Sequence, residues 1–249
     1  MNRGSLLVSR DSFGRAYRVL RRAIQNTQYA SRTTQYDASS ATDIRTKQPI
    51  GKMPNLKIKA VIFDLDGTIT QPFFDFDAIR LEMGFAPDAG PILELMEKMT
   101  PEQREAAEII LLAHEEKAVA ESILNPGAKE TLEELRRRGI LIGILTRNKK
   151  DNAFAVAKKH GLKFDAVVGR EDGPVKPDAF GVLRLCEKFA IKPQEALVVG
   201  DYLFDLLCAR AAKAVPVLLK NQRKADEFAK HADFVIDNIA DILKIIDGR

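Results

Sequence analysis

Acidic side chains, two threonines and one lysine stand in four short polar segments, each at or soon after the end of an apolar run in this 249-residue chain. Crowded carboxylates beside a lysine favour phosphoryl transfer to a carboxylate, because such an attack needs the charges of the carboxylate and the phosphate to be offset. The segments read Asp64-Leu65-Asp66-Gly67-Thr68, Thr146-Arg147-Asn148, Val175-Lys176-Pro177-Asp178 and Gly200-Asp201-Tyr202-Leu203-Phe204-Asp205.

Each residue type has a distinct role in such a reaction. Asp64 is the candidate nucleophile, and with Asp201 it can hold one hard divalent cation, Mg²⁺, through oxygen. Lys176 adds a second positive charge, and the Thr146 hydroxyl with nearby backbone N–H groups can bind the remaining phosphate oxygens. Asp66 can protonate the leaving-group oxygen and then take a proton from the attacking water. Neighbouring carboxylates favour its protonated form.

The apolar runs before these segments predict the strands that position them. Short, nearly continuous apolar runs are typical of a parallel sheet with helices on both faces. Helical patterns at 129–138 and 149–160 lie between them and end at a glycine after several cations. This alternation predicts a doubly wound α/β domain with all four segments at one sheet edge. The predicted strands are 59–63, 140–145, 166–168, 196–199, 215–219 and 234–236.

Residues 72–125 interrupt the alternation, since they show helical patterns and no strand. Thr100-Pro101-Glu102-Gln103 is a capping box with proline at the first helical position, which predicts a helix running towards Ser122. Ligands of open α/β sheets bind beyond the carboxyl ends of the strands. An insert directly after the first strand is therefore expected to form a small helical cap over the site.

In order and loop context, the four segments resemble the motifs of the haloacid dehalogenase-like (HAD) hydrolase superfamily, over about residues 57–247. The resemblance implies a Rossmannoid core of residues 54–71 and 126–249. It also implies that the backbone carbonyl of Asp66 binds Mg²⁺ with Asp64 and Asp201, and that Asp205 is an acid behind these ligands. The insert looks like the small type-one cap of the phosphoglycolate phosphatase-like branch.

Residues 1–53 differ in composition from the rest. They contain ten Lys and Arg but three Asp, a net charge of +7, whereas the remainder carries −3. We predict a basic, disordered leader and a cytoplasmic protein. The alternative is a mitochondrial or other organelle presequence, since residues 13–24 show a basic amphipathic helical pattern. No core face has basic residues interleaved with aromatics, so no nucleic-acid partner is predicted. No apolar run reaches the ~18 residues of a membrane span.

Together these features predict a Mg²⁺-dependent phosphatase that hydrolyses a small phosphate monoester through an aspartyl-phosphate. A phosphomutase acting on a sugar phosphate is one alternative, and a non-catalytic binding protein on the same fold is another. A dehalogenase is disfavoured, because carbon–halogen displacement needs no acid such as Asp66. The expected partner is a small phosphorylated metabolite, and phosphoglycolate, a sugar phosphate and a nucleotide all fit. No feature indicates an oligomeric state. Cys186 and Cys208 lie in apolar helical patterns and are expected to be reduced core thiols.

Overall fold

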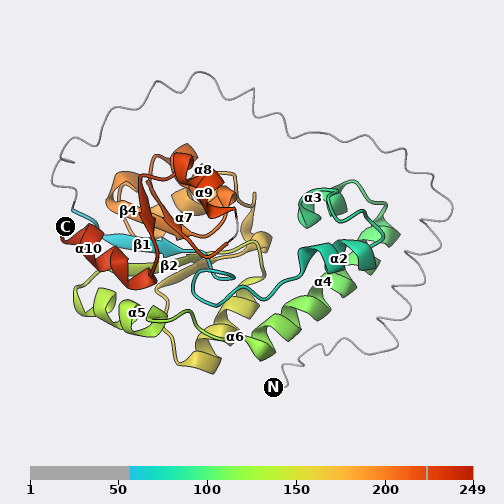
Figure 1. Ribbon diagram of the computed structural model, residues 1–249, viewed down its shortest axis with the longest axis horizontal. Coiled ribbons are helices and arrows are strands. Elements are labelled where there is room, and N and C mark those ends of the chain that lie inside the picture. The colour runs from blue at the N-terminus through green and yellow to red at the C-terminus, as the bar shows by residue number, and fades with distance from the viewer. Residues whose placement is uncertain (1–56, 223, 249) are drawn as a thin grey trace. The chain divides into compact units, whose positions relative to one another are not determined.

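The computed structural model describes residues 57–222 and 224–248, in which the predicted apolar runs form a parallel sheet (Figure 1). Its strand order is β3-β2-β1-β4-β5-β6, with every neighbouring pair parallel. The direction of winding reverses between β1 and β4, the place where open α/β sheets bind ligands. The predicted doubly wound α/β class is confirmed. The strands are β1 (Ala60–Phe63), β2 (Leu141–Leu145), β3 (Ala166–Val168), β4 (Ala196–Gly200), β5 (Val215–Leu219) and β6 (Phe234–Ile236).

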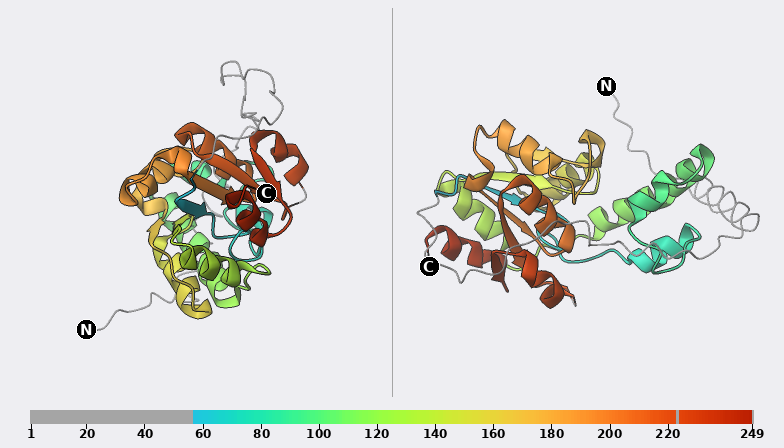
Figure 2. Two further views of the ribbon diagram at one scale, coloured as in Figure 1. Left: turned by 90° about the vertical axis from the view of Figure 1, so that its left-hand side faces the viewer. Right: turned by 90° about the horizontal axis from the view of Figure 1, so that it is seen from above.

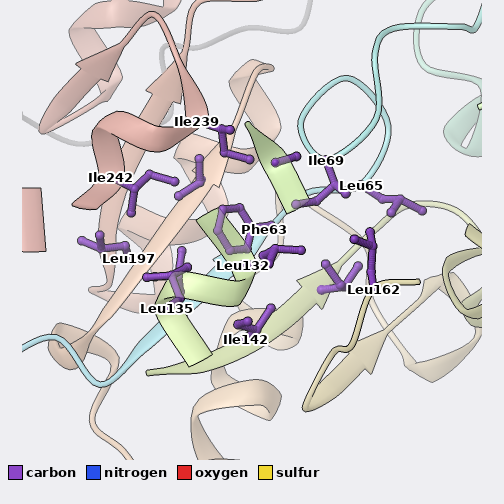
Figure 3. Packing of buried hydrophobic residues seen from close by; sticks show 14 of the residues in the cluster. Phe63, Leu65, Ile69, Leu132, Leu135, Ile142, Leu162, Leu197, Ile239 and Ile242 are labelled. Atoms are coloured by element: carbon purple, nitrogen blue, oxygen red, sulfur yellow. The ribbon is translucent and has the colours of Figure 1, made fainter. Parts of the chain in front are cut away.

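Helices cover both faces of this sheet, as Figures 1 and 2 show. Side chains alternate along a strand, so β1 contributes Val61 and Phe63 to one apolar cluster and Ile62 to the other. The first cluster includes side chains of α5 (Ala128–Arg137), α6 (Lys150–His160) and α10 (Ile242–Ile246), and Figure 3 shows its packing. The second includes side chains of α7 (Phe180–Lys188) and α8 (Leu203–Ala212). A further short helix is α9 (Ala225–Phe228).

The described residues fall into two compact units. Phe74–Ala118 is one, and residues 57–73, 119–222 and 224–248 belong to the other. The smaller unit contains α2 (Phe76–Glu82), α3 (Ile92–Glu97) and most of α4 (Pro101–Glu121). No strand lies among the described residues 72–125. The predicted domain limits, 54–71 with 126–249 and 72–125 for the cap, stay a prediction.

Local signals explain how the smaller unit folds. The predicted capping box opens α4: the backbone N–H of Gln103 donates to Thr100 Oγ1 at 3.3 Å, and that of Thr100 donates to Gln103 Oε1 at 3.0 Å. Arg80 of α2 holds the following loop, donating to the carbonyls of Pro87 and Gly90. Apolar side chains at helical spacing, among them Ile79 and Ile110, fill the unit's own core.

Two further predictions concern residues outside the site. Cys186 and Cys208 are buried and form no disulfide bond, as predicted. None of the described helices is both long and apolar enough to cross a lipid bilayer. The predicted leader, 1–53, lies outside the described residues.

Candidate active site

The carboxyl edge of the sheet brings the predicted site residues together. Asp64 follows β1, Thr146 follows β2 and Asp201 follows β4, and β1 pairs with both other strands. The N–H of Asp64 donates to the Val199 carbonyl at 2.9 Å, which continues the β1–β4 ladder by one residue. Lys176 reaches the same place from the segment between β3 and α7.

Lys176 lies buried between two carboxylates. Its Nζ is 2.5 Å from Asp64 Oδ1 and 2.6 Å from Asp205 Oδ1, and its side chain is only 4% exposed. Burial by itself would lower the pKa of Lys176, but the charges of Asp205 and Asp64 outweigh it and raise the pKa above the usual value. The lysine is therefore a fixed cation beside Asp64.

Asp64 and Asp201 are buried side by side. Oxygens of Asp64, Asp201 and Asp205 lie within 4.8 Å of one another. Burial raises the pKa of Asp64 to about 7, helped by the charges of Asp205 and Asp66 and opposed by Lys176. Burial likewise raises the pKa of Asp201 to about 7, with the charges of Asp64 and Asp205 adding to it. One lysine thus compensates this acidic group only in part.

The hydrogen bonds of the three carboxylates show which of them suit a cation. Asp205 is used on both oxygens, since Oδ1 accepts from Lys176 and Oδ2 from the backbone N–H of Tyr202 at 3.1 Å. Asp64 Oδ2 and Asp201 Oδ1, in contrast, accept no hydrogen bond from any described residue. Asp64 and Asp201 are buried residues, and each thus keeps one carboxylate oxygen without a described donor beside partly uncompensated negative charge. Such a pair of oxygens fits a hard cation such as Mg²⁺.

Asp66 sits in a tight turn next to this group. Gly67 has φ of +98°, and a Cβ at this position would lie 2.3 Å from Asp201 Oδ2, so the turn needs glycine. The Asp66 carboxylate is partly exposed, and its Oδ2 accepts a long hydrogen bond from Asn148 Nδ2 at 3.4 Å. Thr146 Oγ1 accepts from the Asn148 N–H at 3.0 Å, which leaves its hydroxyl proton for a ligand.

Comparison with known proteins identifies the family to which this site belongs. A family model for haloacid dehalogenase-like hydrolases matches residues 85–218. The chain belongs to the haloacid dehalogenase-like hydrolases. An uncharacterized hydrolase of Saccharomyces cerevisiae is 33% identical over an alignment of 198 residues, and the match covers 76% of this chain and 90% of that protein.

Two further relatives match this chain over nearly their whole length. A phosphoglycolate phosphatase of Chromobacterium violaceum is 27% identical over an alignment of 219 residues, and the match covers 77% of this chain and 98% of that protein. The crystal structure of a hydrolase from Pseudomonas syringae superposes with a TM-score of 0.64 at 28% identity, covering 76% of this chain and 98% of that one. The predicted HAD-like membership and the prediction of a hydrolase are confirmed.

Several side chains at the site of this HAD-like hydrolase are not among the predicted site residues. Asn148 bonds to Asp66, and Gln222 Nε2 donates to Asp201 Oδ2 at 2.6 Å. Arg147 donates to the Lys176 carbonyl, and its guanidinium lies over the Phe204 ring at 5.0 Å from the centroid. Asn148 and Arg147 stand next to Thr146 in the sequence, a signal that could have found them. Gln222 follows β5 and has no such signal.

Proposed function

We propose that this HAD-like hydrolase is a phosphatase that hydrolyses a small phosphate monoester through an aspartyl-phosphate on Asp64. The carrying observation is the buried group of Asp64, Asp201 and Lys176 beyond the central strands, with Asp66 two residues after Asp64. The phosphoglycolate phosphatase of Chromobacterium violaceum supports a small phosphorylated acid as the substrate class.

In the first half of the proposed reaction, an Asp64 oxygen attacks phosphorus while the bond from phosphorus to the ester oxygen breaks. Asp66 donates its proton to the departing oxygen, so that an alcohol leaves rather than an alkoxide. Lys176 and the Thr146 hydroxyl bind phosphate oxygens and stabilise the charge of the transition state. Lys176 also offsets the charge of Asp64 itself, since their atoms lie 2.5 Å apart.

In the second half, Asp66 takes a proton from a water molecule whose oxygen attacks the phosphorus. The bond between phosphorus and the Asp64 oxygen then breaks, which releases phosphate and restores the carboxylate. Asp64, Asp201 and the backbone carbonyl of Asp66 would hold Mg²⁺, with Asp205 behind them on Lys176. When bound, the ion supplies positive charge that brings two anions together.

Phosphate release tests this function directly. We expect hydrolysis of a panel of phosphate monoesters that includes phosphoglycolate, glycerol phosphate, sugar phosphates and nucleotides, with one inorganic phosphate formed per alcohol. An isomerised sugar phosphate without phosphate release would instead indicate a phosphomutase. Binding without turnover of any ester, in the presence of Mg²⁺, would support a non-catalytic protein and contradict the proposal.

A second prediction is that turnover requires Mg²⁺. Exhaustive chelation should abolish turnover, and added Mg²⁺ should restore it. Gln222→Ala removes the amide that holds Asp201, so the Mg²⁺ concentration for half-maximal activity should rise roughly 10- to 100-fold. Gln194→Ala, a change of the same kind at an exposed position, should leave that concentration unchanged. Full activity after chelation would contradict the role of the ion.

A further inference from the structure

The turn that carries Asp66 is closed by its own backbone but leaves several carbonyls pointing outward. The N–H groups of Ile69 and Thr70 donate to the Leu65 carbonyl at 3.0 Å each, and Gly67 N–H donates to the Thr70 carbonyl at 3.0 Å. The peptide between Gly67 and Thr68 is held only weakly from within the turn, since its N–H donates to the Leu65 carbonyl at 3.4 Å and its carbonyl accepts no hydrogen bond from the described backbone. Glycine itself allows a wide range of backbone angles. Contacts from outside are needed to hold this peptide.

Two asparagine side chains from distant segments make those contacts. Asn125 Nδ2 donates to the carbonyl of Thr68 at 2.7 Å, and lies 3.1 Å and 3.2 Å from those of Gly67 and Thr70. Asn221, in the loop after β5, donates from Nδ2 to the same Gly67 carbonyl at 2.6 Å. One amide thus comes from the segment before α5 and the other from the far side of β4.

Asn125 is well anchored for this task. Its side chain is buried, its N–H donates to the Ile69 carbonyl at 2.9 Å, and its own carbonyl accepts from Ala128 at the start of α5 at 3.0 Å. A buried amide hydrogen bond is strong in a low-dielectric surrounding, and its loss leaves buried carbonyls without a donor. The turn is therefore held rigidly against α5.

We propose that Asn125 and Asn221 are positioning residues for proton transfer by Asp66. This inference rests on the proposed phosphatase function, in which Asp66 protonates the leaving group. The amides fix the Gly67 peptide, the Gly67 peptide fixes the backbone of Asp66, and Asn148 orients the carboxylate at 3.4 Å. Without the amides the carboxylate stays in the site but no longer keeps the geometry that proton transfer needs.

Leaving-group dependence tests the proposal, because p-nitrophenolate departs without a proton whereas glycerol needs one. The quantity compared is kcat/KM, which reports the first phosphoryl transfer and not the later attack of water. Asp66→Asn, as reference, should lower kcat/KM for glycerol phosphate by roughly 10²- to 10⁴-fold. Asn125→Ala and Asn221→Ala should each lower it by roughly 10- to 100-fold. All three should lower kcat/KM for p-nitrophenyl phosphate much less.

Gln71→Ala is the matched control, since Gln71 Nε2 joins the same two chain segments outside the turn, at 3.4 Å from the Leu124 carbonyl. Gln71→Ala should leave kcat/KM unchanged for both glycerol phosphate and p-nitrophenyl phosphate. If Asn125→Ala does not fold, Asn221→Ala still decides. Equal losses on both esters in the asparagine variants, with selective loss in Asp66→Asn, would overturn the inference and leave the proposed function intact. If Asp66→Asn itself lowers kcat/KM equally for the two esters, Asp66 does not protonate the leaving group, and both the inference and the proposed role of Asp66 are contradicted.

Discussion

Asp64→Asn is expected to lower turnover of every phosphate ester by on the order of 10⁴- to 10⁶-fold while the protein remains folded. An amide oxygen is too poor a nucleophile to displace the alcohol from phosphorus, so no covalent intermediate forms and the remaining groups only bind substrate. The substitution is nearly isosteric, and the Asn oxygen can still accept the hydrogen bond that Lys176 donates to Asp64 Oδ1. Turnover is measured as phosphate release with saturating Mg²⁺.

A second expectation for Asp64→Asn concerns the stability of the folded protein. Burial raises the pKa of Asp64 to about 7 from a usual 3.8, so the ionised carboxylate is less stable in the folded than in the unfolded chain. The contribution of Asp64 to the free energy of unfolding is therefore greatest below pH 3.8, where the carboxyl is protonated in both states, and is lost as the pH rises through 7. At pH 8 without metal, Asp64→Asn should therefore unfold at a temperature no lower than the wild type.

Asp226→Asn is the matched control, because the Asp226 side chain is 86% exposed and pairs with Lys220 at the surface. It should change neither turnover nor unfolding temperature. Wild-type turnover in Asp64→Asn would exclude the aspartyl-phosphate mechanism. A strongly lowered unfolding temperature in Asp64→Asn would instead mean that the lost activity reflects misfolding and not the loss of a nucleophile.

Much of the fold could be predicted because its strands are short and apolar, and all but the edge strand β6 are almost wholly buried. The predicted ranges 166–168, 215–219 and 234–236 coincide with β3, β5 and β6. The predicted limits of β1, β2 and β4 differ from the structure by one residue each, and β4, for example, continues through Gly200. The ends of helices could be predicted from the glycines that follow them. Gly161, for example, terminates α6 in the left-handed conformation. Local chemistry fixes such features, so the sequence shows them.

The acidic residues of the site could be listed from the sequence, but their pairing could not. The sequence leads one to expect Lys176 on phosphate, whereas the structure shows it held by Asp64 and by Asp205 as well. Contacts of this kind depend on how loops meet in space. Asn221 reaches Gly67 across 154 positions, and asparagine is common in loops without any such role, so no pattern marks it.

Lys176→Met is expected to impair both stability and turnover. Methionine keeps the length of the side chain but leaves Asp64 and Asp205 buried without their cation, which should lower the free energy of unfolding by about 3–5 kcal/mol. Loss of a charged phosphate ligand should lower kcat by roughly 10²- to 10³-fold for all esters alike. Unfolding by urea is followed in EDTA, because a bound cation would offset the exposed negative charge.

The pH dependence of that loss follows from the direction of the pKa shifts. Removal of the cation raises the folded-state pKa of Asp64 beyond about 7, so the carboxyl takes up a proton at higher pH than in the wild type. A protonated carboxyl carries no charge that needs Lys176. The destabilisation by Lys176→Met should therefore be largest at pH 8 and should shrink at pH 6, which urea unfolding at the two pH values measures.

A double variant separates the two roles of the lysine. Lys176→Met with Asp205→Asn removes one buried charge together with the cation, while the Asn oxygen can still accept the Tyr202 N–H. Most of the lost stability should return, because only Asp64 remains unpaired. Turnover should stay low, since no cation binds the phosphate oxygens. If the double variant recovers turnover along with stability, Lys176 only neutralises Asp205, and the charge that receives the phosphoryl group must come from another residue.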